Sequence, residues 1–294
     1  MIKNNEWIKE PIIKEPIIKG YQHHAYPLSI MSSHKHFDNW FCNHYIQLKC
    51  NRADTELHFD FCGYIFVQHQ HPFLRVQRIS RNIASTGFKS IGSFVDSALS
   101  LGYCVYLFLD EYYIAEKRAF KKNHFIHDSL ITGQLTEQDG YIMRGYTNKS
   151  TYSELSISSE NLLQAFQAVP DHVEDWQSYI YVIHVDPTAT YSFNMDLFVE
   201  EVKGYYLSIP YNIKLSSFYN LDPLNTIFGI KAQSYLINYI EQTNGFLDIR
   251  PFHIIWEHKL SMDYRLSFLI KNNYLKGEMI EKLDYKMFAH KALI

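Results

Sequence analysis

The chain has 294 residues, of which 47% are hydrophobic and 16% aromatic, with 28 basic and 31 acidic side chains. This length and apolar content suffice for one large core or two smaller ones. The net charge of −3 argues against a nucleic-acid partner, which requires a concentrated cationic face. The sequence shows no apolar run of the roughly 18 residues that cross a bilayer and no signal-peptide pattern. We therefore expect a cytoplasmic bacterial protein without a membrane partner.

The four cysteines are Cys42, Cys50, Cys62 and Cys104, and no two of them form a CxxC pair. This spacing excludes a zinc knuckle and a thioredoxin-type motif. We expect no metal ion and no cofactor.

The first half of the chain alternates helical and strand patterns. Residues 1–24 contain the duplicated sequence KEPII, whose prolines predict an extended arm. Apolar spacing then predicts a helix over residues 37–51 and a strand over 61–67. The following pattern predicts helices over 88–101 and 156–166, and strands over 103–109, 124–133 and 140–147.

After about residue 172 the pattern becomes mainly helical. Residues 176–186 predict one more strand, and residues 225–242 and 254–275 have helical periodicity. We therefore predict an α+β protein with a module over 25–175 and a mainly helical half over 176–294.

Several common catalytic signatures are missing from the sequence: the phosphate-binding GxxxxGK[ST], GxGxxG after a strand, HExxH and GxSxG. Their absence removes the simplest nucleotide-binding, zinc-protease and serine-hydrolase interpretations.

The most informative stretch begins LDEYYIAEKRAFKKNHFIHDSLITG and continues GYIMRGYTNKSTYSELSISSENLLQA. A buried strand ends in an aspartate followed by two tyrosines, and a histidine then opens a strand that runs into glycine. This order resembles the papain-like scaffold of bacteriocin-processing cysteine peptidases and butirosin-type side-chain acyltransferases. The stretch DIRPFHIIWEHK also resembles the tail of uncharacterised Bacillus and Clostridium-type proteins.

The resemblance implies a papain-like module with a catalytic histidine at His127, and His124 is a second candidate nearby. It implies substrate contacts from Asp110, Tyr112, Tyr113 and His124. The family's nucleophilic cysteine lies in the first turn of a long helix, where the helix dipole lowers the thiol pKa. Cys42 lies about one turn further into the predicted helix, so either the helix begins later or the nucleophile is lost. Asn148 is the nearest residue to orient the histidine.

Three other patterns have a functional and a structural interpretation. His69 and His71 lie on one side of an extended segment, which suits a metal ion, but no third ligand follows at a fixed spacing. His253 and Glu257 share one face of a predicted helix that begins at Pro251, which suits either a metal-binding or proton-transfer pair or a hydrogen bond on the helix surface. The basic run at 117–122 suits either a solvated loop or the acidic surface of a carrier protein.

The leading hypothesis is acyl transfer or amide-bond formation from a carrier-protein thioester in natural-product biosynthesis, by a Cys–His mechanism. Its partners would be an acyl carrier protein or a small-molecule amine. The alternatives are a peptide or amide hydrolase and a catalytically silent binding or scaffold protein. Aromatic residues of the C-terminal half also suit a homodimer interface.

Overall fold

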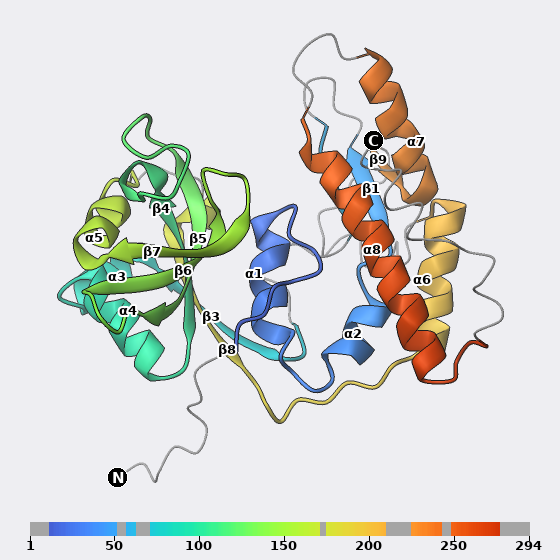
Figure 1. Cartoon of the computed structure of the whole chain (residues 1–294), viewed down its shortest axis with the longest axis horizontal. Helices are drawn as coiled ribbons and strands as arrows, with labels where there is room; N and C mark the ends of the chain where they lie inside the picture. The colour runs from blue at the N-terminus through green and yellow to red at the C-terminus, as the bar shows by residue number, and fades with distance from the viewer. Residues whose placement is uncertain are drawn as a thin grey trace. The chain divides into compact units, whose positions relative to one another are not determined.

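The computed structural model describes residues 12–51, 57–62, 71–170, 175–209, 225–242 and 248–276. The chain divides into two compact units, and each is built from several stretches. Unit 1 comprises Met1–Glu15, Ser29–His34 and Val67–Ala189, and unit 2 comprises Pro16–Leu28, Lys35–Phe66 and Thr190–Ile294. Each unit combines helices with an antiparallel sheet (Figure 1), so the predicted α+β class is confirmed. The papain-like arrangement stays a prediction.

The two units do not follow the division at residues 24 and 175 expected from the sequence. The chain passes from unit 2 to unit 1 within helix α1 (Gln22–Met31), returns to unit 2 after His34, and enters unit 1 again at Val67. The final return to unit 2 comes after Ala189. Composition along the chain cannot reveal such interleaving, because segments distant in sequence complete each unit.

Unit 1 is built on a six-stranded antiparallel sheet of order β3-β8-β4-β5-β6-β7. Its strands are β3 (Leu74–Ser80), β4 (Cys104–Asp110), β5 (Ile126–Gln134), β6 (Gly140–Tyr146), β7 (Tyr152–Ser158) and β8 (Tyr179–Val185). Strand β4 is buried along its whole length between β8 and β5. The β4–β5 register pairs Leu109 with His127 and Asp110 with Ile126.

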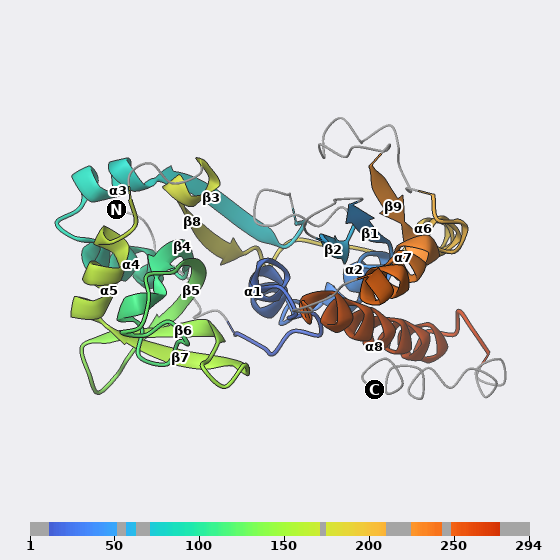
Figure 2. The same ribbon diagram turned by 90° about the horizontal axis from the view of Figure 1, so that it is seen from above.

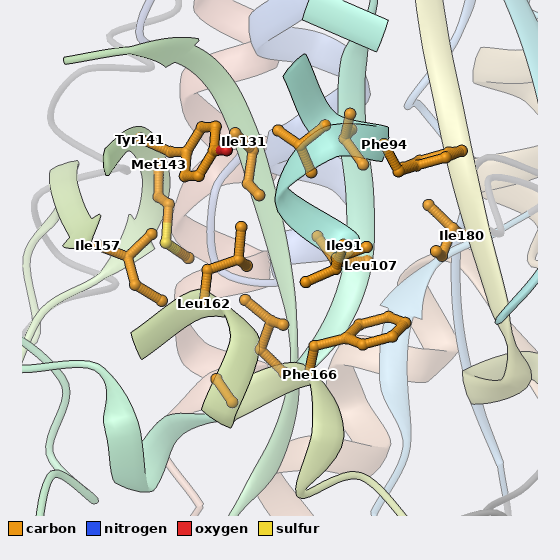
Figure 3. Packing of buried hydrophobic residues seen from close by; sticks show 14 of the residues in the cluster. Ile91, Phe94, Leu107, Ile131, Tyr141, Met143, Ile157, Leu162, Phe166 and Ile180 are labelled. Atoms are coloured by element: carbon orange, nitrogen blue, oxygen red, sulfur yellow. The ribbon is translucent and has the colours of Figure 1, made fainter. Parts of the chain in front are cut away.

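Three helices pack on this sheet: α3 (Arg81–Gly87), α4 (Ile91–Ser100) and α5 (Ser159–Gln167). The side chain of Ser90 accepts from the backbone of Ser93 to cap α4, and Ser158 likewise caps α5. Figure 3 shows the resulting core, in which side chains of α4 and α5 meet those of the strands.

Alternation along β4 decides which side chains enter this core. Val105, Leu107 and Leu109 belong to the buried cluster that includes the helices. Because successive side chains of a strand point to opposite faces, the Asp110 side chain lies on the face of the sheet opposite to Val105, Leu107 and Leu109. A short 3-10 turn, η1 (Glu111–Tyr113), follows directly.

Unit 2 contains a three-stranded antiparallel sheet in the order β2 (Phe59–Phe61), β1 (Leu48–Asn51), β9 (Thr226–Phe228). Helix α7 (Gly229–Gln242) packs on β1 and helix α8 (Arg250–Lys271) packs on β2 (Figure 2). The helices of this unit, besides the first part of α1, are α2 (Phe37–Asn43), α6 (Met195–Leu207), α7 (Gly229–Gln242) and α8 (Arg250–Lys271). A further 3-10 turn, η2 (Asp175–Ser178), precedes β8 in unit 1.

No helix within the described residues is long and apolar enough to cross a membrane.

A buried arginine holds the end of α2. Arg265 of α8 is fully buried, and its guanidinium donates to the carbonyl oxygens of Phe41 and His44. A cation at a helix C-terminus satisfies carbonyl groups that have no partner within the helix. Two elements distant in sequence are thereby tied together.

Most elements predicted for the part of the chain that forms unit 1 are confirmed. In unit 2, the helix predicted over residues 37–51 is wrong in its second half. Helix α2 ends at Asn43, and Leu48–Asn51 forms strand β1. The chain turns at Tyr45, whose φ of 57° lies in the left-handed region that a helix cannot include. Of the strand predicted over 61–67, Phe61 ends β2 and residues 63–67 lie outside the described residues.

Candidate functional site

The end of β4 and the start of β5 bring two histidines together with two carboxylates. We call this set the β4–β5 end; it comprises Asp110, Tyr112, Tyr113, His124, His127 and Asp128. The register Asp110–Ile126 brings the segment 124–128 beside the end of β4. Five of its six members are residues that the sequence predicted for a site.

Asp110 organises this end of the sheet through three hydrogen bonds. Its Oδ1 accepts from the backbone N–H groups of Tyr112 and Phe125, both at 3.0 Å. Its Oδ2 lies 2.5 Å from His124 Nδ1. Because an ionised carboxylate only accepts, Nδ1 of His124 carries the hydrogen and donates it. In the neutral form of the ring, Nε2 then carries the lone pair that can take a proton.

Burial differs sharply between the two partners. The Asp110 side chain is 2% exposed, whereas the His124 side chain is 66% exposed. The Tyr112 ring stacks on the His124 imidazole with 4.5 Å between ring centroids and an interplanar angle of 22°. A buried carboxylate and an aromatic ring therefore fix the orientation of an imidazole that solvent can reach.

His127 forms a second histidine–carboxylate pair with its neighbour in sequence. Its Nδ1 lies 2.7 Å from Asp128 Oδ1, and Tyr106 donates its hydroxyl to Asp128 Oδ2 at 3.2 Å. Burial lowers the pKa of His127, but the hydrogen bond and charge of Asp128, helped by Glu111, outweigh burial and raise it. The orienting partner seen in the structure is thus Asp128.

Asn148, predicted to orient His127, lies exposed in the turn between β6 and β7. Its backbone N–H donates to the carbonyl oxygen of Glu116 at 2.7 Å. Its role in orienting the histidine stays a prediction.

Cys42, predicted as the nucleophile, belongs to unit 2, whereas His127 and Asn148 belong to unit 1. The Cys42 side chain is fully buried within α2. Burial raises the pKa of the thiol to about 12, although the charge of Arg265 acts to lower it. At neutral pH this cysteine is therefore a thiol and not the thiolate that attacks carbonyl groups.

Two of the remaining cysteines resemble Cys42 in this respect. Burial raises the pKa of Cys62 and that of Cys104 to about 12. Cys50 is buried in strand β1. All four have free thiols.

The basic run at 117–122 is only partly a surface feature. Lys117 is 3% exposed at its side chain and pairs with Glu111 at 3.0 Å. Arg118, Lys121 and Lys122 are exposed, and Arg118 donates to Ser150 Oγ at 2.9 Å. Three of the four cations of this run are therefore exposed to solvent.

The two other patterns in the sequence are the histidine pair near residue 70 and the histidine–glutamate pair of the last long helix. His69 lies outside the described residues and His71 is buried. Glu257 is fully buried in α8 and accepts from the backbone N–H groups of Lys19 and Gly20, both at 2.8 Å. Pro251 lies in the first turn of α8, as predicted.

Asp128 was not predicted from the sequence, because it follows His127 directly and neighbouring residues of a regular strand point to opposite faces. The run HDS within an otherwise apolar strand is the available signal, since buried carboxylates require a partner.

Comparison with models of known protein families gives no match to this chain. Comparison with curated proteins gives no match either.

Proposed function

We propose that unit 1 carries a histidine general-base site that transfers an acyl group to an amine, with water as a competing acceptor. The observation that supports it is the Asp110–His124 pair, in which a buried carboxylate lies 2.5 Å from Nδ1 of a solvent-accessible imidazole. Such a pair fixes the tautomer of the ring and stabilises the imidazolium that forms during proton transfer.

In the proposed reaction, Nε2 of His124 takes a proton from the attacking amine as its nitrogen bonds to the carbonyl carbon of a thioester. The carbon–sulfur bond then breaks, and the same proton passes to the leaving thiolate. Asp110 keeps Nδ1–H in place throughout. The exposed cations Arg118, Lys121 and Lys122 suit an acidic carrier protein as the donor.

The proposal assigns proton transfer to His124 and requires no thiol nucleophile. Burial keeps the pKa of Cys42 near 12, so the fraction of thiolate at neutral pH is negligible. His127, held by Asp128, would serve as a second proton donor or as a charged contact for the substrate.

The test uses S-acetyl-N-acetylcysteamine as donor and glycinamide as acceptor, with acetylglycinamide quantified by chromatography. His124→Gln should lower the rate at least about 100-fold, because a positioned general base contributes roughly that much. Asp110→Asn should lower it too, since an amide does not fix the same tautomer. Cys42→Ala should leave it unchanged.

His184→Gln is the matched control, since His184 lies on β8 of the same unit and contacts the Gly102 carbonyl oxygen. It should retain the wild-type rate. A loss of activity in Cys42→Ala with none in His124→Gln would exclude the general-base assignment and restore the thiol mechanism.

A second candidate is binding without catalysis. The supporting observation is the aromatic set of Tyr112, Tyr113 and His124, whose rings contact one another on a partly exposed surface. If the wild-type protein produces no acetylglycinamide above the buffer rate, catalysis of this reaction is excluded and binding becomes the better explanation.

A further inference from the structure

A second cluster of histidine and carboxylate side chains lies in unit 2, away from the residues discussed so far. His23 and His24 occupy the first turn of α1, and Asp60 lies in the middle of β2. His23 Nε2 is 3.0 Å from Asp60 Oδ2, and His24 Nε2 is 2.7 Å from Asp60 Oδ1. The carboxylate therefore presents one oxygen to each imidazole.

The separations among these three groups suit coordination of one ion. All three offer a ligand atom, and these atoms lie within 4.8 Å of one another. An ion about 2.1 Å from each ligand atom places neighbouring ligand atoms roughly 3.0 Å apart at a right angle and roughly 3.4 Å apart in a tetrahedron. The two nitrogen–oxygen distances of 3.0 and 2.7 Å, each to a different carboxylate oxygen, are at or slightly below this range, and the 4.8 Å limit covers all three ligand atoms. A movement of the side chains would therefore be needed to admit the ion.

The surrounding side chains hold the cluster in a fixed position. His24 is fully buried, and the rings of Tyr45 and Phe61 meet it edge-on at centroid distances of 5.3 and 5.7 Å. Tyr45 has a φ of 57°, which is rare for a bulky residue and is found at sites where the backbone is held in place by its surroundings. The Tyr21 ring stacks on His23 at 5.2 Å.

The segment that leads into α1 is fixed as well. The Glu257 carboxylate accepts the backbone N–H groups of Lys19 and Gly20. A Cβ atom at Gly20 would lie 3.0 Å from Glu257 Oε2 and 3.2 Å from His253 Cβ, so the approach is close. Rigid support of this kind is what a ligand set needs to keep its geometry.

Burial and the neighbouring charges have opposing effects on the pKa values of Asp60 and His24. Burial raises the pKa of Asp60, but the two histidines outweigh burial and hold that pKa below its usual range. Burial lowers the pKa of His24 and outweighs the charge and the hydrogen bond of Asp60, which act to raise it. The charges of His23 and Lys49 act in the same direction as burial.

Without an ion, both imidazoles can donate Nε2–H to the carboxylate. His24 Nδ1 is buried and has no hydrogen-bond partner within the described residues. The ring can therefore move its hydrogen from Nε2 to Nδ1 without breaking a bond there, which frees Nε2 for an ion. The unsatisfied Nδ1–H that results should lower the affinity by roughly 5- to 150-fold relative to a site in which that N–H has a partner.

We propose that His23, His24 and Asp60 bind one divalent first-row transition-metal ion. Two imidazoles and one carboxylate are a ligand set for zinc and for non-haem iron, and the set leaves coordination positions open for water or a small ligand. The side chains of His23 and Asp60 are 33% and 20% exposed, so solvent reaches this side of the cluster.

The test titrates the untagged, chelator-treated full chain with Co²⁺ at pH 7.5 and follows the visible ligand-field bands. Isothermal titration calorimetry with Zn²⁺ gives the stoichiometry and affinity. We expect one ion per chain and at least a tenfold lower affinity in His23→Gln and in Asp60→Asn. His23→Gln is the safer variant for folding because His23 is partly exposed, and circular dichroism of the metal-free protein checks it.

Two histidine variants outside the cluster control for adventitious binding: His253→Gln in unit 2 and His184→Gln in unit 1. Both should bind Co²⁺ as the wild type does. The proposal is overturned if the wild type binds no ion, if folded His23→Gln binds with wild-type affinity, or if the control variants lose the same binding.

Discussion

Two histidine–carboxylate pairs lie at the β4–β5 end, and they differ at the level of the single residue. His124 is largely exposed and has a buried partner in Asp110. His127 is 38% exposed and lies beside Asp128, which itself accepts from Tyr106. Opposing effects meet at His127, because burial disfavours its charged form while Asp128 favours it. The net direction shows that the carboxylate prevails.

Replacing Asp128 by asparagine should therefore lower the pKa of His127. The raised pKa contributes stability that is fully present below the unfolded value near 6.5 and is lost as pH rises through the folded value. Asp128→Asn should remove this contribution. The measurement is an NMR titration of the imidazole protons.

His44 in unit 2 serves as the internal reference in the same spectra, because burial lowers its pKa to about 4. Its midpoint should be the same in both proteins. If His127 titrates identically with aspartate and with asparagine at position 128, Asp128 is not the cause of the raised pKa.

At the level of secondary structure, sequence predicted the elements whose pattern is local. Strand β4 is a continuous apolar run, and α4 and α5 begin at serine caps that the sequence shows directly. Helix α1 was missed because it contains Pro27, and β9 was missed because it has three residues. Neither element has a strong periodicity of its own; each is stabilised by its neighbours.

The same distinction applies to the functional residues. Asp110, Tyr112, Tyr113, His124 and His127 follow one another closely in sequence, so a linear pattern could indicate them. His24 and Asp60 meet only because α1 and β2 pack together within unit 2. No spacing rule predicts that contact, which explains why no metal site was expected.

The β6–β7 pair offers a test of close packing between elements. A Cβ atom added at Gly140 would lie 2.4 Å from the Ile157 carbonyl oxygen and 3.0 Å from Ser158 Cα. Because both contacts are to backbone, Gly140→Ala should destabilise the protein by about 1–3 kcal/mol. Urea unfolding followed by circular dichroism measures the change.

Gly87→Ala is the matched substitution, since a Cβ atom at Gly87 meets nothing within 4 Å. Gly87 is the last residue of α3, so alanine should be neutral or stabilise the protein by up to about 1 kcal/mol. Equal effects of the two alanines would show that the close approach at Gly140 is relieved by a shift of the strands.

At the scale of the whole molecule, the two units should respond differently to acid. In unit 2, burial lowers the pKa values of His24, His44 and His258, so their unfolded forms take up protons near pH 6.5 before the folded forms do. Burial raises the pKa values of Glu201 and Glu257 to about 7, which acts in the opposite direction between pH 7 and 4.5. Three histidines against two glutamates leave a net loss of stability as pH falls.

We therefore expect unit 2 to lose stability as pH falls below 6.5. In unit 1, the stability that comes from the raised pKa of His127 is fully present below pH 6.5, so it is not lost as pH falls. Hydrogen exchange at pH 7.0 and 5.0, corrected for intrinsic rates, should show lost protection in α2 and α8 and retained protection in β4 and β5. His44→Gln should reduce the loss, and greater acid sensitivity of β4 and β5 would contradict this account.

The position of β1 between β2 and β9 also has a consequence for synthesis on the ribosome. Lys49 of β1 pairs with Asp60 on one side and with Phe228 on the other. Because synthesis begins at the N-terminus, strands β3 to β8 are all made before β9, the strand that pairs with the second edge of β1. An open strand edge is a template for pairing with another nascent chain. Lys49 is a charged residue of β1, and charged side chains on an edge strand oppose its pairing with strands of other chains. We expect Lys49 to have this effect until β9 has been made and has paired with β1.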